Sequence, residues 1–185
     1  EVLIGHSEDV LPWAASRLRS RGTTADLVFL DQRGSRYSAD LGALDRAGAL
    51  GEGCVVVADN VLKPGAPLFL WHLARDPRFD TCVVSVPEFA MGDVEDWMTV
   101  SRCDPSAGSG AAWPEPPLAV RALEWRAERM RARTHRPDHG GSGVGFAEWA
   151  AFAAAMRGEM RAAGLAAEIE SDVARIAFGG GAAQE

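Results

Sequence analysis

The stretch "GCVVVADNVLKPGAP", residues 53–67, joins an apolar run to an acid and an amide. Cys54 to Ala58 are apolar, Asp59 and Asn60 follow directly, and a Lys-Pro-Gly turn comes next at 63–65. Apolar runs without polar alternation are typical of strands buried in a parallel sheet. Polar residues after such a strand lie where loops converge at the carboxyl edge of the sheet. The stretch therefore predicts a buried strand whose end carries side-chain oxygens.

The same arrangement recurs on both sides of this stretch. The run "DLVFLD" (26–31) ends in Asp31, and "TCVVSVPE" (81–88) ends in Glu88. Two further strand candidates are 2–4 and 97–103. The spacing of apolar residues predicts helices between the strands, over 9–21, 37–50 and 67–77. Strands alternating with helices predict an α/β fold with a parallel, doubly wound sheet covered on both faces.

The composition changes near residue 104. Residues 104–117 are rich in Pro, Gly, Ser and Ala, which is typical of a linker. Three apolar stripes with helical spacing follow: Val120, Leu123, Ala127 and Met130; Phe146, Trp149, Ala153, Met156 and Met160; Leu165, Ile169, Val173 and Ile176. We therefore expect an α/β region over 1–103, a linker over 104–117 and a helical extension of unassigned role over 118–185.

Charge, apolar run length and cysteine count limit the kinds of partner and the compartment that we expect for this protein. A formal charge of −7 and a pI near 5.1 speak against nucleic acid or an anionic membrane surface as the main partner. No apolar run approaches the roughly 20 residues that span a bilayer, and no signal-peptide pattern is visible, so we expect a cytoplasmic protein. Three scattered cysteines predict neither a disulfide framework nor a C-x-x-C metal site. Because the chain starts at Glu1 rather than Met, we expect a processed product, an excised domain or an incomplete sequence, and of these we favour a fragment of a longer chain.

The strand ends supply oxygen ligands only. Asp31, Asp59 and Asn60 suit a hard cation, Mg²⁺ before Ca²⁺ or Mn²⁺. Single acids that end strands are also commonly helix caps or surface residues, so this pattern by itself leaves a metal role open.

Longer stretches resemble a known family. "VLIGHSEDVLP" (2–12), "ADLVFLDQRGSRYSAD" (25–40) and "GCVVVADNVLKPGAPLFLWHL" (53–73) resemble the C-terminal half of the catechol O-methyltransferases. The likeness extends over residues 1 to about 103 and includes Glu88. It implies part of a Rossmann-like methyltransferase sheet, with S-adenosylmethionine and Mg²⁺ as cofactors and a catechol or other phenol as the small-molecule partner.

The resemblance also implies roles for individual residues. Asp31, Asp59 and Asn60 would bind Mg²⁺. Asn60 and Glu88 would be catalytic, orienting the diol. The substrate would contact Asp31, Asn60, Pro64 and Glu88, and the cofactor would contact Gly5, Ser7, Glu8, Asp31 and Gln32.

The sequence departs from the family at the general base. The family has a lysine three residues after the first metal acid, and Gly34 stands there in this chain. Arg33 stays protonated at working pH and cannot serve as a base. Lys63 is the candidate replacement, and its alternative is a solvated turn residue.

The family's glycine-rich turn and ribose-binding acid lie upstream of residue 1. We therefore expect this chain alone to be inactive. Two alternatives stay open: a methyltransferase of the same fold with another phenolic acceptor, and an inactive remnant that acts as a binding module.

Overall fold

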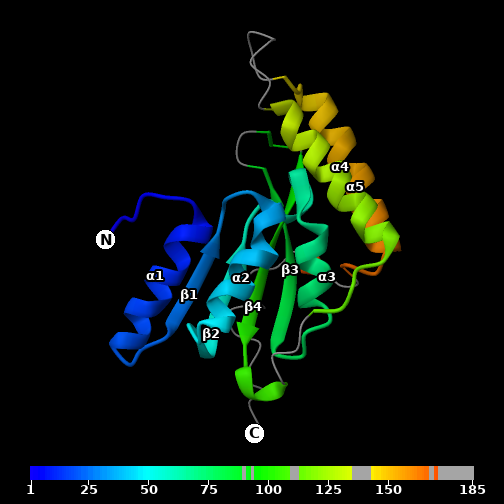
Figure 1. Cartoon of the computed structure of the whole chain (residues 1–185). Coiled ribbons are helices and arrows are strands. Elements are labelled where there is room, and N and C mark those ends of the chain that lie inside the picture. Colours follow the sequence, from blue (N-terminus) through cyan, green and yellow to red (C-terminus); the bar gives the residue numbers. More distant parts are fainter. Residues whose placement is uncertain (89–90, 93, 109–112, 135–142, 167–168, 171–185) are drawn as a thin grey trace, which may run out of the picture.

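A computed structural model describes residues 1–88, 91–92, 94–108, 113–134, 143–166 and 169–170. Its sheet has the strand order β1-β2-β4-β3-β5 (Figure 1). The strands are β1 (Ala25–Leu30), β2 (Leu50–Ala58), β3 (Phe79–Pro87), β4 (Glu95–Cys103) and β5 (Ile169–Glu170). The helices are α1 (Ser7–Ser20), α2 (Tyr37–Arg46), α3 (Pro67–Leu73), α4 (Leu118–Thr134) and α5 (Phe146–Ala162). The predicted α/β class is confirmed.

The predicted parallel sheet is only partly correct. β1 and β2 are parallel, and β5 runs parallel to β3, but β4 is antiparallel to both β2 and β3. Residues 88–94 alone join β3 to β4. A parallel connection needs a crossover of about a dozen residues or more, so this short connection produces a hairpin.

The predicted short strand at 2–4 is wrong. The structure assigns no strand there, and Val2 and Ile4 are 89% and 97% exposed. A strand needs a neighbour that accepts and donates its backbone hydrogen bonds, and an apolar run without one does not form a strand. Among the described residues, β1 therefore forms an edge of the sheet.

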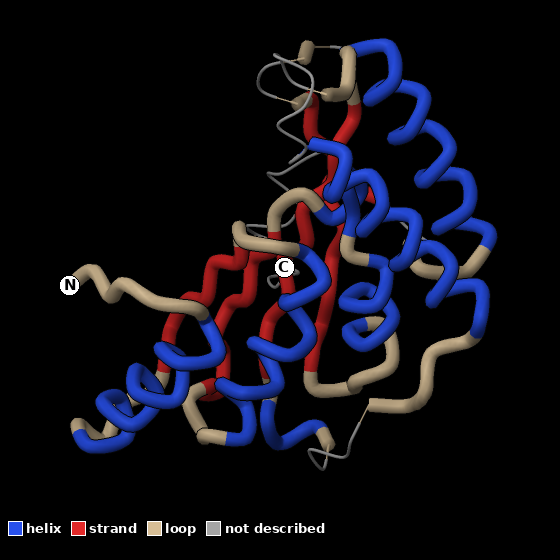
Figure 2. The backbone as a smooth tube through the Cα atoms, turned by 45° about the horizontal axis from the view of Figure 1, so that its top comes forward, coloured by secondary structure: helices blue, strands red, loops and turns tan. Residues whose placement is uncertain are grey.

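Helices α1, α2 and α3 lie along one face of the sheet (Figures 1 and 2). Successive side chains of a strand point to opposite faces. In β1, Leu30 is 4% exposed, whereas Leu27 and Phe29 are 61% and 55% exposed. The expectation that both faces are covered is therefore wrong for the β1 end of the described sheet.

The helical extension packs against the turn that follows β2. Helices α4 and α5 lie side by side and contact η2 (Val61–Gly65), a short irregular turn (Figure 2). The predicted stripe of α4 is buried throughout. In α5, Trp149 and Met156 are buried as expected, but Phe146 is 66% exposed. The extension therefore reaches the residues that the sequence marked as functional.

The third predicted helix is wrong where the structure describes it. Ile169 and Glu170 form β5, which pairs with Val83 and Val84 of β3. Pairing with a free sheet edge decides the backbone here, because it satisfies backbone donors and acceptors that helical spacing cannot reveal. The rest of that stripe, beyond 170, lies outside the described residues.

Candidate functional site

The ends of β1 and β2 bring the two predicted metal acids together. Leu30 and Ala58 are partners in the parallel register, and the Asp59 N–H donates to the Leu30 carbonyl at 2.9 Å. Asp31 and Asp59 are therefore the next residues after two paired positions on neighbouring strands. Neighbouring strands of a sheet lie about 4.8 Å apart.

The pKa of Tyr37 is sensitive to the charges at the ends of β1 and β2. Its buried hydroxyl lies 3.0 Å from the Asp59 carbonyl oxygen and 3.3 Å from that of Gln32. Burial raises the pKa of this hydroxyl, and the Asp31 and Asp59 carboxylates raise it further. Both carboxylates therefore lie close enough to the Tyr37 hydroxyl to influence its pKa, as Arg131 and Asp96 also do.

Asn60 follows in the left-handed conformation, with φ 53°, which Asn adopts more readily than most residues. Its backbone N–H donates to Asp59 Oδ1 at 2.7 Å. Its side-chain Nδ2 donates to Asp96 Oδ2 at 3.2 Å, so the amide oxygen stays available as a ligand. Two carboxylates and one amide oxygen form the predicted donor set.

Among the described residues, no group of three or more His, Cys, Asp or Glu is arranged to hold a metal ion. The predicted set is of another kind, because its third member is an amide. The assignment of Mg²⁺ to Asp31, Asp59 and Asn60 therefore stays a prediction.

Asp96 is a functional candidate that the sequence reasoning missed. It is 2% exposed in β4 and accepts backbone hydrogen bonds from Leu62 (3.2 Å), Lys63 (2.9 Å) and Trp97 (2.7 Å). Burial raises the pKa of Asp96 to about 6. The carboxylate positions the turn after Asn60. The sequence predicts a strand over 97–103, whereas β4 begins at Glu95 and includes Asp96. The feature that could have identified Asp96 is an acid next to an apolar strand.

Lys63 is not a solvated turn residue. It is 5% exposed, and its Nζ lies 2.6 Å from Glu88 Oε2 and 4.0 Å from Asp96 Oδ2. It also lies over the ring of Trp149 in α5, 4.7 Å from the centroid. Two of the three candidate catalytic side chains, Lys63 and Glu88, thus form an ion pair. An ammonium has no lone pair with which to accept a proton, so a role for Lys63 as base stays a prediction.

A first cavity of about 630 Å³ gathers the predicted cofactor residues Gly5, Ser7, Glu8 and Gln32. Phe29 and Leu44 contribute apolar surface to it. The side chain of Gln32 is held by a hydrogen bond from Nε2 to Asp40 Oδ2 at 2.8 Å. Residues from several elements therefore line one cavity with the mixed apolar and polar surface that is typical of small-molecule sites. Asp31, the fifth predicted cofactor residue, is not among its lining residues.

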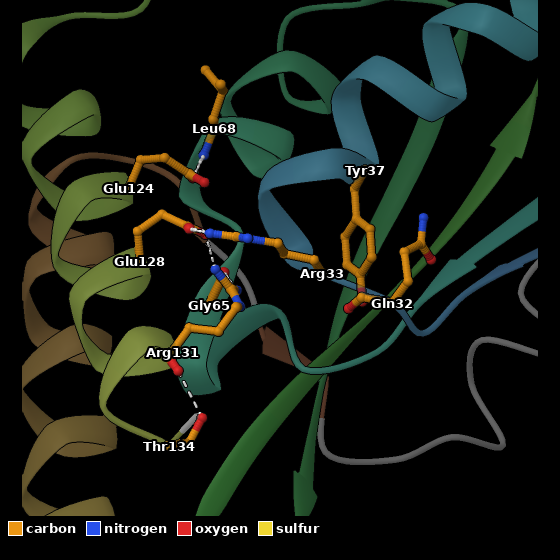
Figure 3. Close-up of polar contacts among 9 residues, drawn as sticks. All are labelled: Gln32, Arg33, Tyr37, Gly65, Leu68, Glu124, Glu128, Arg131 and Thr134. Carbon is orange, nitrogen blue, oxygen red and sulfur yellow. Dashed lines mark hydrogen bonds and ion pairs between the residues drawn. The ribbon is translucent and has the colours of Figure 1, made fainter. Parts of the chain in front are cut away.

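A second cavity of about 590 Å³ adjoins the first and shares Gln32 and Arg33 with it. Of the predicted substrate residues, Pro64 lines this cavity, whereas Asp31, Asn60 and Glu88 do not. Its remaining wall includes Arg131, Thr134 and Trp149 of the helical extension. Figure 3 shows Gln32 and Arg33 on one side and Arg131 and Thr134 on the other.

Comparison with known proteins gives one consistent result. Catechol O-methyltransferase of Bos taurus is 40% identical over 79 residues, which cover 43% of this chain and 28% of that protein. Its counterpart in Sus scrofa is also 40% identical over 79 residues, covering 43% of this chain and 41% of that protein. The resemblance to the catechol O-methyltransferases is confirmed. No family model matches the chain.

The chain spans less than half of these catechol O-methyltransferases, 28% and 41% of their lengths. The human transmembrane O-methyltransferase is 44% identical over 79 residues, covering 43% of this chain and 26% of that protein. In the part of the present chain that the structure describes, no helix has both the length and the apolar character needed to cross a membrane.

Among solved structures, an O-methyltransferase from Bacillus cereus in complex with SAH has a TM-score of 0.45 and 17% identity. The match covers 56% of this chain and 50% of that chain. A similarity this low supports no conclusion about function.

Proposed function

We propose that this chain supplies the metal- and acceptor-binding part of an S-adenosylmethionine-dependent O-methyltransferase that acts on catechols. The observation that carries the proposal is the pairing of Leu30 with Ala58, which sets Asp31 and Asp59 at neighbouring strand ends. The likeness to catechol O-methyltransferases over 79 residues supports the choice of reaction.

The donor set fits Mg²⁺. Asp31 and Asp59 offer carboxylate oxygens, and the hydrogen bond from Asn60 to Asp96 leaves the amide oxygen as a third ligand. All three donors are hard oxygen atoms, and three protein ligands leave coordination positions for a diol. When bound, the cation would lower the pKa of a hydroxyl group that it coordinates.

The chain's own residues would position the reactants. Gly5, Ser7, Glu8 and Gln32 would hold the adenine in the first cavity, and S-adenosylmethionine would supply the methyl group. Pro64 would form a wall for the acceptor ring. Asp96 would orient Asn60 by accepting a hydrogen bond from the Asn60 side-chain amide. Glu88 would accept a hydrogen bond from the hydroxyl that is not methylated. Holding the reacting atoms close and aligned contributes most of the acceleration in such a transfer.

Glu88 meets this role only after a change of partner. Its carboxylate now holds the Lys63 ammonium at 2.6 Å. A catechol hydroxyl that reaches Glu88 would share or replace this contact. The ion pair would thereby hold the carboxylate in place until the acceptor binds.

Titration of the chain with Mg²⁺ by calorimetry tests the proposal. We expect binding that Asp59→Ala and Asp31→Ala each abolish. Asp26→Ala is the matched control, because Asp26 is exposed near the opposite end of β1. Mg²⁺ binding that persists unchanged in Asp59→Ala refutes the metal assignment.

A second measurement addresses the catechol. Catechol binding should require Mg²⁺, while the chain alone should give no methyl transfer to catechol in a radiolabel assay. Catechol binding that does not depend on Mg²⁺ would instead favour the alternative of an inactive binding module.

A further inference from the structure

Gly34 stands where the catechol O-methyltransferases have a lysine, and the structure shows what fills that space. A Cβ atom at Gly34 would lie 2.7 Å from the Gly65 carbonyl oxygen and 2.9 Å from Nη2 of Arg131. Real Cβ atoms essentially never approach other atoms this closely. The helical extension has therefore placed a guanidinium beside the position from which a lysine would project.

Arg131 is held firmly at this place. It is 9% exposed, its Nη2 donates to the Gly65 carbonyl at 3.0 Å, and its Nη1 pairs with Glu128 (Figure 3). Glu128 also pairs with Arg33, which approaches from the β1 side. One carboxylate thus serves two guanidinium groups, and the cluster of Arg33, Glu128 and Arg131 keeps a net charge of one positive unit.

This cluster borders the second cavity. Both Arg33 and Arg131 line the cavity, whereas Glu128 and the other described acids are not among its lining residues. Pro64 and Trp149 contribute flat apolar surfaces to the same space, and Trp149 is 8% exposed. The cavity thus combines surfaces suited to a planar ring with a positively charged border.

We propose that the α4–α5 extension forms a wall of the acceptor cavity and selects a phenolic acceptor that carries a carboxylate. The inference rests on the proposed function for the identity of the ring. Guanidinium groups attract carboxylates through charge-assisted hydrogen bonds. Arg33 would donate this bond, because its side chain is 60% exposed, whereas Arg131 already donates to Gly65 and Glu128. An acceptor with an ammonium group would be repelled by the same border. Arg131 contributes positive charge to the border of the cavity. It cannot replace the missing base, because arginine remains protonated.

A matched pair of ligands tests the inference. The probes 3,4-dihydroxybenzoate and 3,4-dihydroxybenzylamine share the catechol ring and differ in the sign of their charge. Binding of each to the full chain is measured by calorimetry at saturating Mg²⁺. We expect the benzoate to bind about tenfold more tightly, the effect of one charged hydrogen bond. The preference should weaken as the salt concentration rises, because salt screens exposed charges.

Variants then locate the source of the preference. Arg33→Gln is the primary variant, because its side chain is 60% exposed and we expect its replacement to disturb the packing little. It should reduce the preference at least about threefold. Arg131→Gln, checked for folding by circular dichroism, should reduce it as well. Arg129→Gln is the control, because it removes the same charge from an exposed position on α4, over the ring of Trp125.

The outcomes separate this inference from the proposed function. Equal affinities for the two probes, or a preference that survives Arg33→Gln and a folded Arg131→Gln, overturn the selectivity for carboxylates. A loss that is equal in Arg129→Gln also overturns it, because net charge would then be the cause. In each of these cases Mg²⁺ binding at Asp31 and Asp59 can stand. Failure of Mg²⁺ binding itself defeats the proposed function instead.

Discussion

The Lys63 ammonium lies 2.6 Å from the Glu88 carboxylate, and the two side chains are 7% and 21% exposed. Lys63 comes from the turn after β2, and Glu88 directly follows β3. Asp96 lies 4.0 Å from the same ammonium. The Lys63 ammonium therefore links the turn after β2 to two carboxylates, Glu88 just after β3 and Asp96 in β4.

Removal of the Lys63 ammonium should lower the free energy of unfolding. Lys63→Met leaves Glu88 and Asp96 without the ammonium, and an uncompensated buried charge costs about 3 kcal/mol or more. Urea denaturation should show this loss in the free energy of unfolding. The double variant Lys63→Met/Glu88→Leu should recover part of it. Arg17→Met is the control, since its pair with Glu1 is 38% and 60% exposed and should contribute less than about 1 kcal/mol.

Asp96 should give the stability a characteristic pH dependence. Burial raises its pKa from 3.8 to about 6, against hydrogen bonds from Asn60 and Trp97 and the charge of Lys63. Between these values the folded protein binds more protons than the unfolded chain. The contribution of Asp96 is therefore fully present below about pH 4 and is lost as the pH rises through about 6.

Comparison with Asp96→Asn isolates this effect. The difference in free energy of unfolding, wild type minus variant, should fall between about pH 4 and 6 and level off above. The hydrogen bond lost from Asn60 adds a constant offset. Urea denaturation at several pH values measures the difference, and a difference that does not vary with pH would contradict the assignment.

Gly34 should tolerate no side chain. Gly34→Ala places a Cβ atom 2.7 Å from the Gly65 carbonyl oxygen, so the η2 turn and Arg131 must shift. We expect a loss of about 1–3 kcal/mol in thermal or urea denaturation. Gly158→Ala in α5 is the matched control, because nothing lies within 4 Å of the added atom. It should stabilise the protein by about 0.5–1 kcal/mol, and a similar loss in both variants would argue against steric exclusion.

The two faces of β1 should respond differently to the same substitution. Leu30→Ala removes a side chain that is 4% exposed and should cost about 2–5 kcal/mol. Leu27→Ala, at a position that is 61% exposed, should cost less than about 1 kcal/mol. Equal losses in urea denaturation would mean that both faces of β1 are covered in solution.

Much of the local structure could be predicted from periodicity. The apolar runs ending at Asp31 and Asp59 are strands, and the stripe from Val120 to Met130 is the buried face of α4. These patterns are local, because burial repeats with the period of the element itself. The prediction of a strand at 2–4 was wrong because a strand also requires a neighbouring strand, which no local pattern reveals.

The site divides in the same way. The order of residues along the chain determined that an acid follows β1 and that an acid and an amide follow β2, and the register of two parallel strands made them neighbours. Only the tertiary structure decided that Lys63 is paired with Glu88, that Asp96 holds the turn after Asn60, and that Arg131 borders the second cavity beside Gly34. Such contacts join residues far apart in the chain. They depend on how whole elements pack, for which no short stretch of sequence carries a signal.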